Sequence, residues 1–198
     1  MSNTTPENLI LLCGELLTDG DVSHDKNGDV YREYSMKITL PSGTDVLPVL
    51  IHEAQIDDTV VKGAVISVTG KLLSFTTDDE RQVLKVLVGE VYAGETEITS
   101  GIFLTGSVLK KPYVYTLESG ERAEFHLSLA VEDGDAVRVP VACSGENVAT
   151  AKGLRAGDTV SVLGQLHSYE YLDLNAAATD SYTAYEVEIL TFTNVSFL

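Results

Sequence analysis

The chain has 198 residues, of which 44% are hydrophobic and 22% are charged, a composition typical of a folded globular protein rather than a disordered one. Its 13 Lys and Arg oppose 30 Asp and Glu, and the resulting net charge of −17 excludes non-specific attraction to nucleic acid or to anionic membranes as a default function. No apolar run approaches the ~20 residues of a membrane span, the first residues lack the basic region of a signal peptide, and the two cysteines are far apart in the sequence, so we expect a cytoplasmic protein that does not associate with membranes.

The first half of the chain predicts a succession of strands. An Asn-Gly pair at residues 27–28 favours a tight hairpin turn, because both residues tolerate a positive φ. Residues 34–40 alternate apolar and polar side chains, which is the pattern of a half-buried strand. We expect a short helix over residues 53–61, ending at Gly63, and then a strand at the β-branched residues 65–68.

The second half repeats this plan. A hairpin turn at residues 118–121, an alternating strand at residues 125–131 and a helix at residues 146–154, with Gly153 as an earlier end, follow in the same order. The matching segments are residues 14–17 with 106–109, 46–49 with 138–141, 62–72 with 156–166, and 85–88 with 186–189. Their offset grows from 92 to 94 and then to 101 residues, which places the additional residues of the second copy in loops, as expected for a duplicated domain. The polar stretch between the copies gives domains 1–95 and 99–198.

Five strands with a helix between the third and the fourth are typical of the oligonucleotide/oligosaccharide-binding (OB) fold. The sequence therefore predicts an all-β protein made of two five-stranded OB-fold barrels in tandem, each with a short helix between strands 3 and 4. Two small β-barrels of another kind are the alternative, because periodicity does not fix the order of the strands.

Several segments of the second copy form a series with a regular order. Residues 125–131 read Phe-His-Leu-Ser-Leu-Ala-Val, residues 154–166 read Leu-x-x-Gly-x-x-Val-x-Val-x-Gly-x-Leu, and residues 106–112 begin with Gly and end with Pro. In this order and spacing they are similar to the bacterial single-stranded DNA-binding protein (SSB) family, which the first copy resembles more faintly. The resemblance implies an OB-fold protein that binds single-stranded DNA in replication, repair or recombination, mainly through its second copy.

Binding of single strands requires cations for the phosphates and aromatic rings for the bases. Tyr171 lies where the SSB family carries a stacking aromatic, and Tyr169 shares its face of the strand. The chain has no Trp, and Cys143 and Ser144 stand where that family places an aromatic residue. The candidate nucleic-acid-binding residues are Tyr113, Tyr115, Tyr169 and Tyr171 for stacking, and Lys110, Lys111, Arg122, Arg138 and Arg155 for charge.

These tyrosines have a second interpretation, since Tyr is also common where a long hairpin or a subunit interface packs. The first copy has only Tyr31, Tyr34 and Phe75 in comparable places. We therefore expect the first copy to have a structural role, either supporting the second copy or pairing with another chain.

The acid excess keeps a different function open. Residues 1–99 contain seven Lys and Arg against seventeen Asp and Glu, a net charge of −10, and residues 100–198 contain six against thirteen, a net charge of −7. An acidic tandem OB-fold protein could instead bind a basic protein partner, build a homo-oligomer or imitate nucleic acid. Residues 19–29 resemble a calcium loop, but with Gly28 at its sixth position Ser23 and Tyr34 stand first and twelfth, where Asp and Glu are needed. The four histidines are scattered. We expect no cofactor, no metal and no enzymatic activity.

Overall fold

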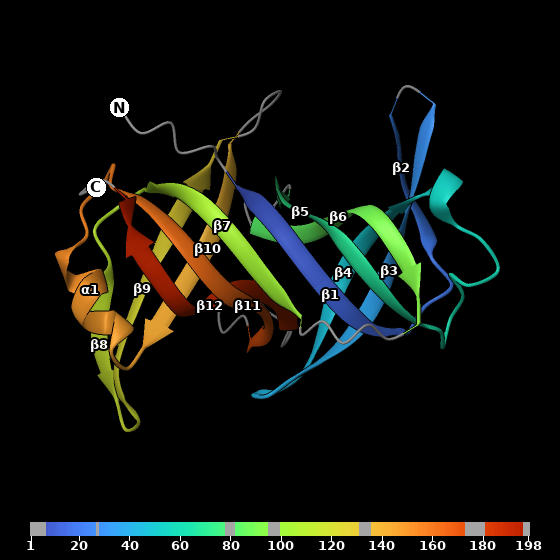
Figure 1. Cartoon of the computed structure of the whole chain (residues 1–198). Coiled ribbons are helices and arrows are strands. Elements are labelled where there is room, and N and C mark those ends of the chain that lie inside the picture. Colours follow the sequence, from blue (N-terminus) through green and yellow to red (C-terminus); the bar gives the residue numbers. More distant parts are fainter. Residues whose placement is uncertain are drawn as a thin grey trace. The chain divides into compact units, whose positions relative to one another are not determined.

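The computed structural model describes residues 7–26, 28–77, 82–94, 100–130, 136–172 and 181–195 (Figure 1). The chain divides into two compact units. Unit 1 comprises Met1–Asn8, Gly101–Leu166 and Tyr185–Leu198, and unit 2 comprises Leu9–Ser100 and His167–Ala184. In the described part of the chain, no helix combines the length and the apolar character that a membrane span requires.

Unit 2 is built mainly from the first half of the chain. Its strands are β1 (Asn8–Leu16), β2 (Asp21–Lys26), β3 (Asp29–Leu40), β4 (Gly43–His52), β5 (Val65–Thr76) and β6 (Gln82–Ala93). They lie in the order β2-β3-β4-β6-β5-β1, and β1 also pairs with β3, so that the strands close on themselves. The alternation predicted for residues 34–40 is confirmed, because Tyr34, Met36, Ile38 and Leu40 are buried in the core.

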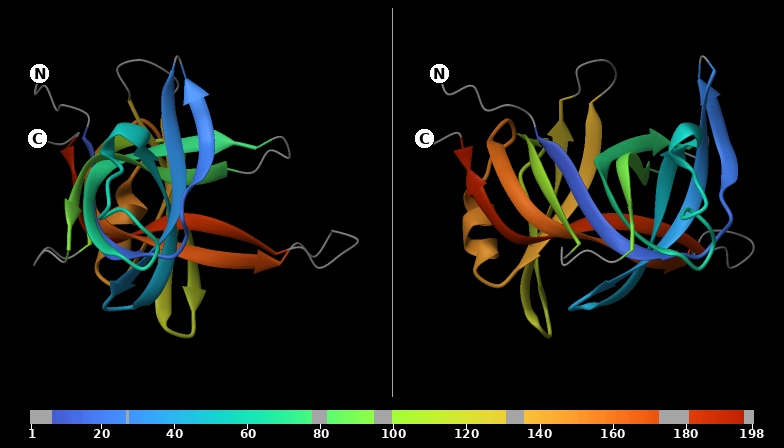
Figure 2. Two further views of the ribbon diagram at one scale, coloured as in Figure 1. Left: turned by 90° about the vertical axis from the view of Figure 1, so that its right-hand side faces the viewer. Right: turned by 45° about the vertical axis from the view of Figure 1, so that its right-hand side comes forward.

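Unit 1 repeats this order. Its elements are β7 (Gly101–Val108), β8 (Tyr113–Leu117), β9 (Gly120–Leu129), β10 (Val137–Ser144), α1 (Asn147–Gly153), β11 (Thr159–Leu172) and β12 (Ser181–Asn194), with the ends of β11 and β12 that connect to one another belonging to unit 2. The order is β7-β11-β12-β10-β9-β8, and β7 also pairs with β9. Both views of Figure 2 show β8 and β9 extending as a long hairpin from the rest of this unit.

The repeated segments of the sequence occupy equivalent positions in the two units. β4 pairs with β6 in parallel, with Val49 opposite Val86, and β10 pairs with β12 in parallel, with Val141 opposite Val187. The repeated glycines have a common physical reason. A Cβ atom at Gly70 would lie 2.2 Å from the carbonyl oxygen of Leu87, and one at Gly164 would lie 2.5 Å from that of Glu188. Both glycines therefore permit a close approach of two strand backbones.

The strand count differs from the prediction of five in each half, since the described residues form six strands in each unit. The additional strands are β2 and β8, which pair antiparallel with β3 and β9. Each is joined to its neighbour by a predicted hairpin turn, with Gly28 at φ 90° in one unit and Gly120 at φ 123° in the other. Positive φ at these glycines permits the tight turns that join the paired strands.

The two predicted helices had different outcomes. The helix over residues 146–154 is confirmed to within one residue as α1. The prediction of a helix over residues 53–61 was wrong, because only a 3-10 turn forms, at Glu53–Gln55. The side chain of Asp57 accepts hydrogen bonds from the backbone N–H and the hydroxyl of Thr59, at 2.8 and 2.5 Å. This local turn competes with helical hydrogen bonding, and the β-branched Val60 and Val61 that follow add little helix propensity.

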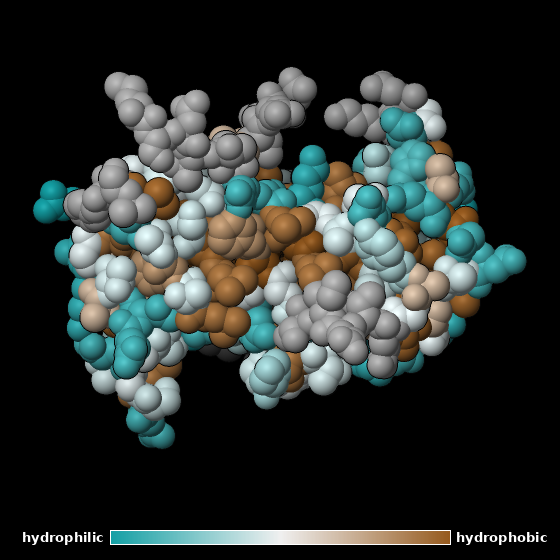
Figure 3. Space-filling view, in the orientation of Figure 1, coloured by the Kyte–Doolittle hydropathy of each residue, from teal (hydrophilic) through white to brown (hydrophobic). Residues whose placement is uncertain are grey.

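The outer surface of unit 1 varies from strand to strand. Leu163 of β11 and Leu190 of β12 are about half exposed, and apolar side chains gather over these strands and β7 (Figure 3). The outer surface of β8, β9 and β10 carries tyrosines and charged side chains instead. Several of the predicted binding residues lie on this part of the unit.

Candidate nucleic-acid interface

The alternation of β9 sorts its side chains between the core and the outer surface. Ala123, Phe125, Leu127 and Leu129 are buried, so the residues between them point outward. The register of β8 places Tyr113 opposite Glu124 and Tyr115 opposite Arg122, and the register of β10 places Pro140 opposite His126. We call this outer surface the β8–β10 face, and its residues are Tyr113, Tyr115, Arg122, Glu124, His126, Arg138 and Pro140.

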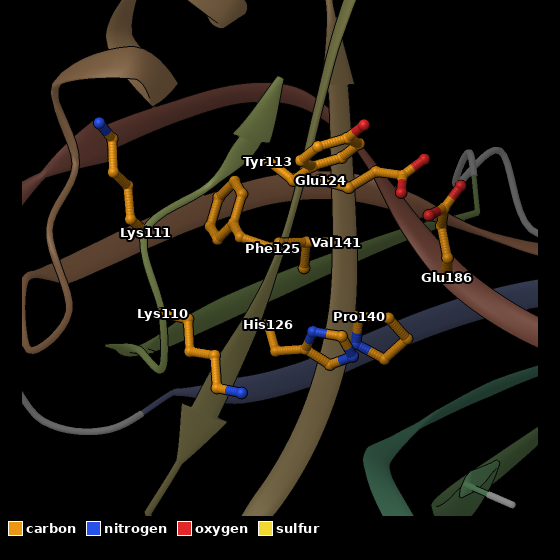
Figure 4. Close-up of a pocket in the computed structure, with 9 residues that line it drawn as sticks. All are labelled: Lys110, Lys111, Tyr113, Glu124, Phe125, His126, Pro140, Val141 and Glu186. Carbon is orange, nitrogen blue, oxygen red and sulfur yellow. The ribbon is translucent and has the colours of Figure 1, made fainter. Parts of the chain in front are cut away.

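A groove of about 270 Å³ lies along this face (Figure 4). It is lined by Lys110, Lys111, Tyr113, Glu124, Phe125, His126, Pro140, Val141 and Glu186. In Figure 4, Glu124, Glu186 and the ring of Tyr113 lie at one side of the groove, and Lys110 and His126 lie at the other. Both lysines come from the segment between β7 and β8 and are exposed. The groove therefore combines an aromatic surface, two ammonium groups and two carboxylates.

Tyr113 provides an exposed aromatic surface at this groove. Its ring stacks on that of Tyr115, with a centroid distance of 5.5 Å and an interplanar angle of 28°. The hydroxyl of Tyr115 donates a hydrogen bond to Glu124, which raises the pKa of Tyr115. Tyr115 is thereby fixed behind Tyr113, while 69% of the surface of Tyr113 is exposed. An aromatic ring supported on one side and open on the other is suited to stacking with a base.

Arg122 lies at the centre of a cluster of three carboxylates. Its guanidinium contacts Glu186 at 2.5 Å, Glu188 at 2.8 Å and Glu124 at 3.4 Å. Burial raises the pKa of Glu186, and the positive charge of Arg122 opposes that shift. Only 16% of the Arg122 side chain is exposed. The guanidinium is thus paired with carboxylates, and the predicted role of Arg122 in supplying charge to a phosphate stays a prediction.

The remaining cations of the face gather near His126. Partial desolvation lowers the pKa of His126, and the positive charges of Arg138 and Lys110 lower it further. The imidazole is therefore neutral at pH 7. Four cations, Lys110, Lys111, Arg122 and Arg138, then face three carboxylates, Glu124, Glu186 and Glu188. Among the residues that the structure describes, these seven side chains sum to +1, in a chain whose net charge is −17.

Three of the predicted binding residues lie elsewhere. Arg155 is exposed in the turn before β11, where its backbone N–H donates to the side chain of Asp158 at 2.8 Å, and it is not among the residues that line the groove. Tyr169 and Tyr171 belong to unit 2. The ring of Tyr171 stacks on Tyr182 at 5.6 Å, and that of Tyr169 lies 6.3 Å from His167. A role for these residues in binding stays a prediction.

Three residues that line the groove were not among the predicted binding residues, namely Glu124, His126 and Glu186. A signal for the first two was present, because the period of two that buries Phe125 also places Arg122, Glu124 and His126 on the opposite face. Glu186 had no comparable signal. It reaches this groove only because β12 pairs with β10 in parallel across the unit.

Unit 2 offers a different surface. The predicted counterpart Tyr34 is buried, with 2% of its surface exposed, and burial raises its pKa. The groove beside it, of about 390 Å³, is lined by four carboxylates, from Asp19, Glu53, Asp57 and Asp58, and by Arg32. The guanidinium of Arg32 contacts Glu53 at 3.1 Å and donates to the carbonyl of Gly20 at 3.2 Å. Within the described residues, no cluster of three or more His, Cys, Asp or Glu could hold a metal ion.

Two solved structures similar to this chain are both of the single-stranded DNA-binding protein from Thermus aquaticus. The wild-type protein has 18% sequence identity and a TM-score of 0.77, with 96% of this chain and 94% of that chain covered. A deletion mutant of it has 19% identity and a TM-score of 0.75, with the same coverage of both chains. No protein-family model and no curated protein matches the sequence. The likeness shows that the chain has an SSB-like fold.

Proposed function

We propose that this chain binds single-stranded nucleic acid along the β8–β10 face, with the groove beside Tyr113 as its centre. The observation that carries this proposal is the combination of Lys110 and Lys111 with the exposed ring of Tyr113 at one groove. In this proposal unit 1 is an OB-fold barrel that performs the binding. Unit 2 is a second OB-fold barrel, and the proposed domains, residues 1–95 and 99–198, supply most of unit 2 and most of unit 1, respectively.

The physical basis is the same as for other single-strand-binding surfaces. Each base stacked on an aromatic side chain contributes ~1–3 kcal/mol, and the cations supply much of the remaining affinity. Lys110 and Lys111 would contact the phosphates, since both are exposed at the groove. Arg138 would add charge beside them. Because so few cations are available, we expect affinity to be modest and to fall as salt is added.

The fold likeness to a protein described as single-stranded DNA-binding supports DNA as the ligand. The biological setting that follows is DNA replication, repair or recombination in the cytoplasm, without enzymatic activity. A contribution of Arg155, Tyr169 and Tyr171 to binding is a separate part of the proposal. In this proposal Arg122 positions the glutamates of the face rather than binding a phosphate.

A second candidate function is a protein-interaction module. The net charge of −17 favours a basic protein partner. The exposed side chains of Leu163 and Leu190 favour a homo-oligomer. The two candidate functions differ in the surface that they use. A single strand would bind the β8–β10 face, whereas a basic partner would bind the acidic remainder of the surface.

A fluorescence-anisotropy titration distinguishes the two functions. A labelled single-stranded oligonucleotide is titrated with the full chain at 20 and 200 mM salt, with the equivalent duplex as competitor, and a labelled lysine-rich peptide is titrated in the same way. The proposal expects binding that weakens with salt and that the duplex competes for poorly. Lack of oligonucleotide binding at low salt, together with saturable binding of the peptide, would support the protein-interaction module instead.

A further inference from the structure

The side of the groove next to Tyr113 presents hydrogen-bond acceptors. Oε1 of Glu124 accepts hydrogen bonds from the hydroxyl of Tyr115 and from Nε of Arg122, and Oε1 of Glu186 accepts from Nη2 of Arg122. In the described part of the chain, Oε2 of neither carboxylate accepts a hydrogen bond. Figure 4 shows both carboxylates on the same side of the groove, beside the ring of Tyr113.

A base stacked on Tyr113 would direct its edge at these carboxylates. An ionised carboxylate accepts hydrogen bonds and cannot donate them, so it discriminates between bases by the donors that they present. Guanine offers two adjacent donors, N1–H and the N2 amino group, whereas adenine and cytosine each offer one amino group. Thymine offers a single N–H between two carbonyl oxygens, which a carboxylate repels.

We propose that Glu124 and Glu186 make this groove selective for guanine in a single strand, and against thymine. The inference rests on the proposed function, and it names the base that the groove recognises. It also explains why carboxylates occur on a surface that binds phosphates. Arg122 contacts both of them and offsets their charge, while Lys110 lies at the other side of the groove (Figure 4), where the backbone of the strand would pass.

The test compares oligonucleotides that differ at one position. A labelled 15-nucleotide strand of thymidines is titrated with the full chain and compared with strands in which the central base is guanine or hypoxanthine. A single guanine avoids quadruplex formation, and hypoxanthine keeps N1–H but lacks the amino group. A good bidentate contact to a base contributes ~1–3 kcal/mol of discrimination. We therefore expect the guanine strand to bind about tenfold more tightly than the all-thymine strand. The hypoxanthine strand should have an intermediate affinity.

Three variants assign the preference to its residues. Glu124→Gln and Glu186→Gln each replace an acceptor-only group at the groove by an amide that also donates, so the preference should fall below about twofold in both. Glu188→Gln is the matched control. It also removes one of the carboxylates that pair with Arg122, but Glu188 does not line the groove. All three variants should bind the all-thymine strand more tightly, and only Glu188→Gln should keep the preference.

The outcomes separate this inference from the proposed function. If the wild-type chain binds all three strands equally, the inference is wrong and single-strand binding stands. If it binds none of them at 20 mM salt, the proposed function fails as well. A guanine preference that survives in both groove variants would assign recognition to other residues and overturn the inference.

Discussion

The groove of unit 1 and the groove of unit 2 occupy units with the same strand order, yet they differ in charge. The groove of unit 1 has two lysines against two glutamates. The groove of unit 2 has one arginine against four carboxylates. A phosphate backbone can approach the groove of unit 1 from the side of its lysines. The four carboxylates of the groove of unit 2 repel it.

The outer faces also differ at equivalent positions. Glu33 of β3 pairs with Lys85 of β6, at 2.5 Å, which balances one charge with one charge. Glu124, which stands at the equivalent position in unit 1, shares Arg122 with Glu186 and Glu188. The comparison indicates that the same fold carries a one-to-one ion pair on the face of unit 2 and one arginine shared by three glutamates on the face of unit 1. Function therefore depends on the side chains of each face rather than on the fold.

Reversing the lysine charges should break this difference most strongly. The double variant Lys110→Glu, Lys111→Glu changes the charge of the groove by four, and we expect about 100-fold weaker oligonucleotide binding at low salt. The matched control is Lys62→Glu, Lys71→Glu, which makes the same change at exposed positions of unit 2. Equal losses in the two double variants would mean that total charge, rather than the groove of unit 1, controls binding.

The glycines test whether the two units have equivalent backbones. Gly164→Ala and Gly70→Ala each place a Cβ within 2.5 Å of a carbonyl oxygen, so each should lower the free energy of unfolding by about 2 kcal/mol. Gly89→Ala is the control, because its Cβ would meet Thr69 at an ordinary 3.6 Å. Chemical denaturation of the three variants measures the effect. A loss at Gly70 alone would show that the close approach of strands differs between the units.

Removing the stacking ring sharpens the comparison of aromatic residues. Tyr113→Ala should weaken binding about tenfold, because one stacked base is lost. Phe75→Ala removes an exposed ring from unit 2 and should change affinity less than twofold. The anisotropy titration described above measures both variants. If the larger loss occurs in Phe75→Ala, the binding surface lies on unit 2.

A pH dependence of binding is the smallest expected effect. Glu186 has a raised pKa, so it takes up a proton at a higher pH than an ordinary glutamate as the pH falls from 7 towards 5. Desolvation and the nearby positive charges lower the pKa of His126, so it gains its charge at a lower pH than an ordinary histidine. Both changes add positive charge to the face, so affinity should rise a few-fold as the pH falls. In Glu186→Gln the rise should begin at a lower pH, and an unchanged curve would exclude Glu186 as its cause.

The sequence predicted much of the fold because its signals are local. Alternation along residues 34–40 and 125–131 depends on burial of one strand face, which the structure retains over residues 34–40 and 125–130, residue 131 lying outside the described residues. Cys143, in β10, is buried in the core, and this burial raises the pKa of its thiol to about 11. The predicted helix at residues 53–61 failed because Asp57 and Thr59 form a competing turn, a preference that hydrophobic patterning does not report.

The candidate site was predicted less completely because it depends on pairing between distant strands. Lys110, Lys111 and Tyr113 are close in the sequence and line the groove together. The interaction of Arg122 with Glu186 joins residues 64 positions apart, and neither the composition nor the periodicity of the chain indicates it. The net charge of each half of the sequence is an average, so it does not indicate that the described cations on the β8–β10 face outnumber the described carboxylates there.

Photo-crosslinking tests the central claim most directly. A single-stranded oligonucleotide with one 5-iododeoxyuridine is bound to the full chain at low salt and irradiated, and the crosslinked peptides are identified by mass spectrometry. Single-strand binding at the groove of unit 1 predicts crosslinks at Tyr113 that disappear in the Lys110→Glu, Lys111→Glu variant. Crosslinks confined to residues 9–100, with none at Tyr113, would contradict it.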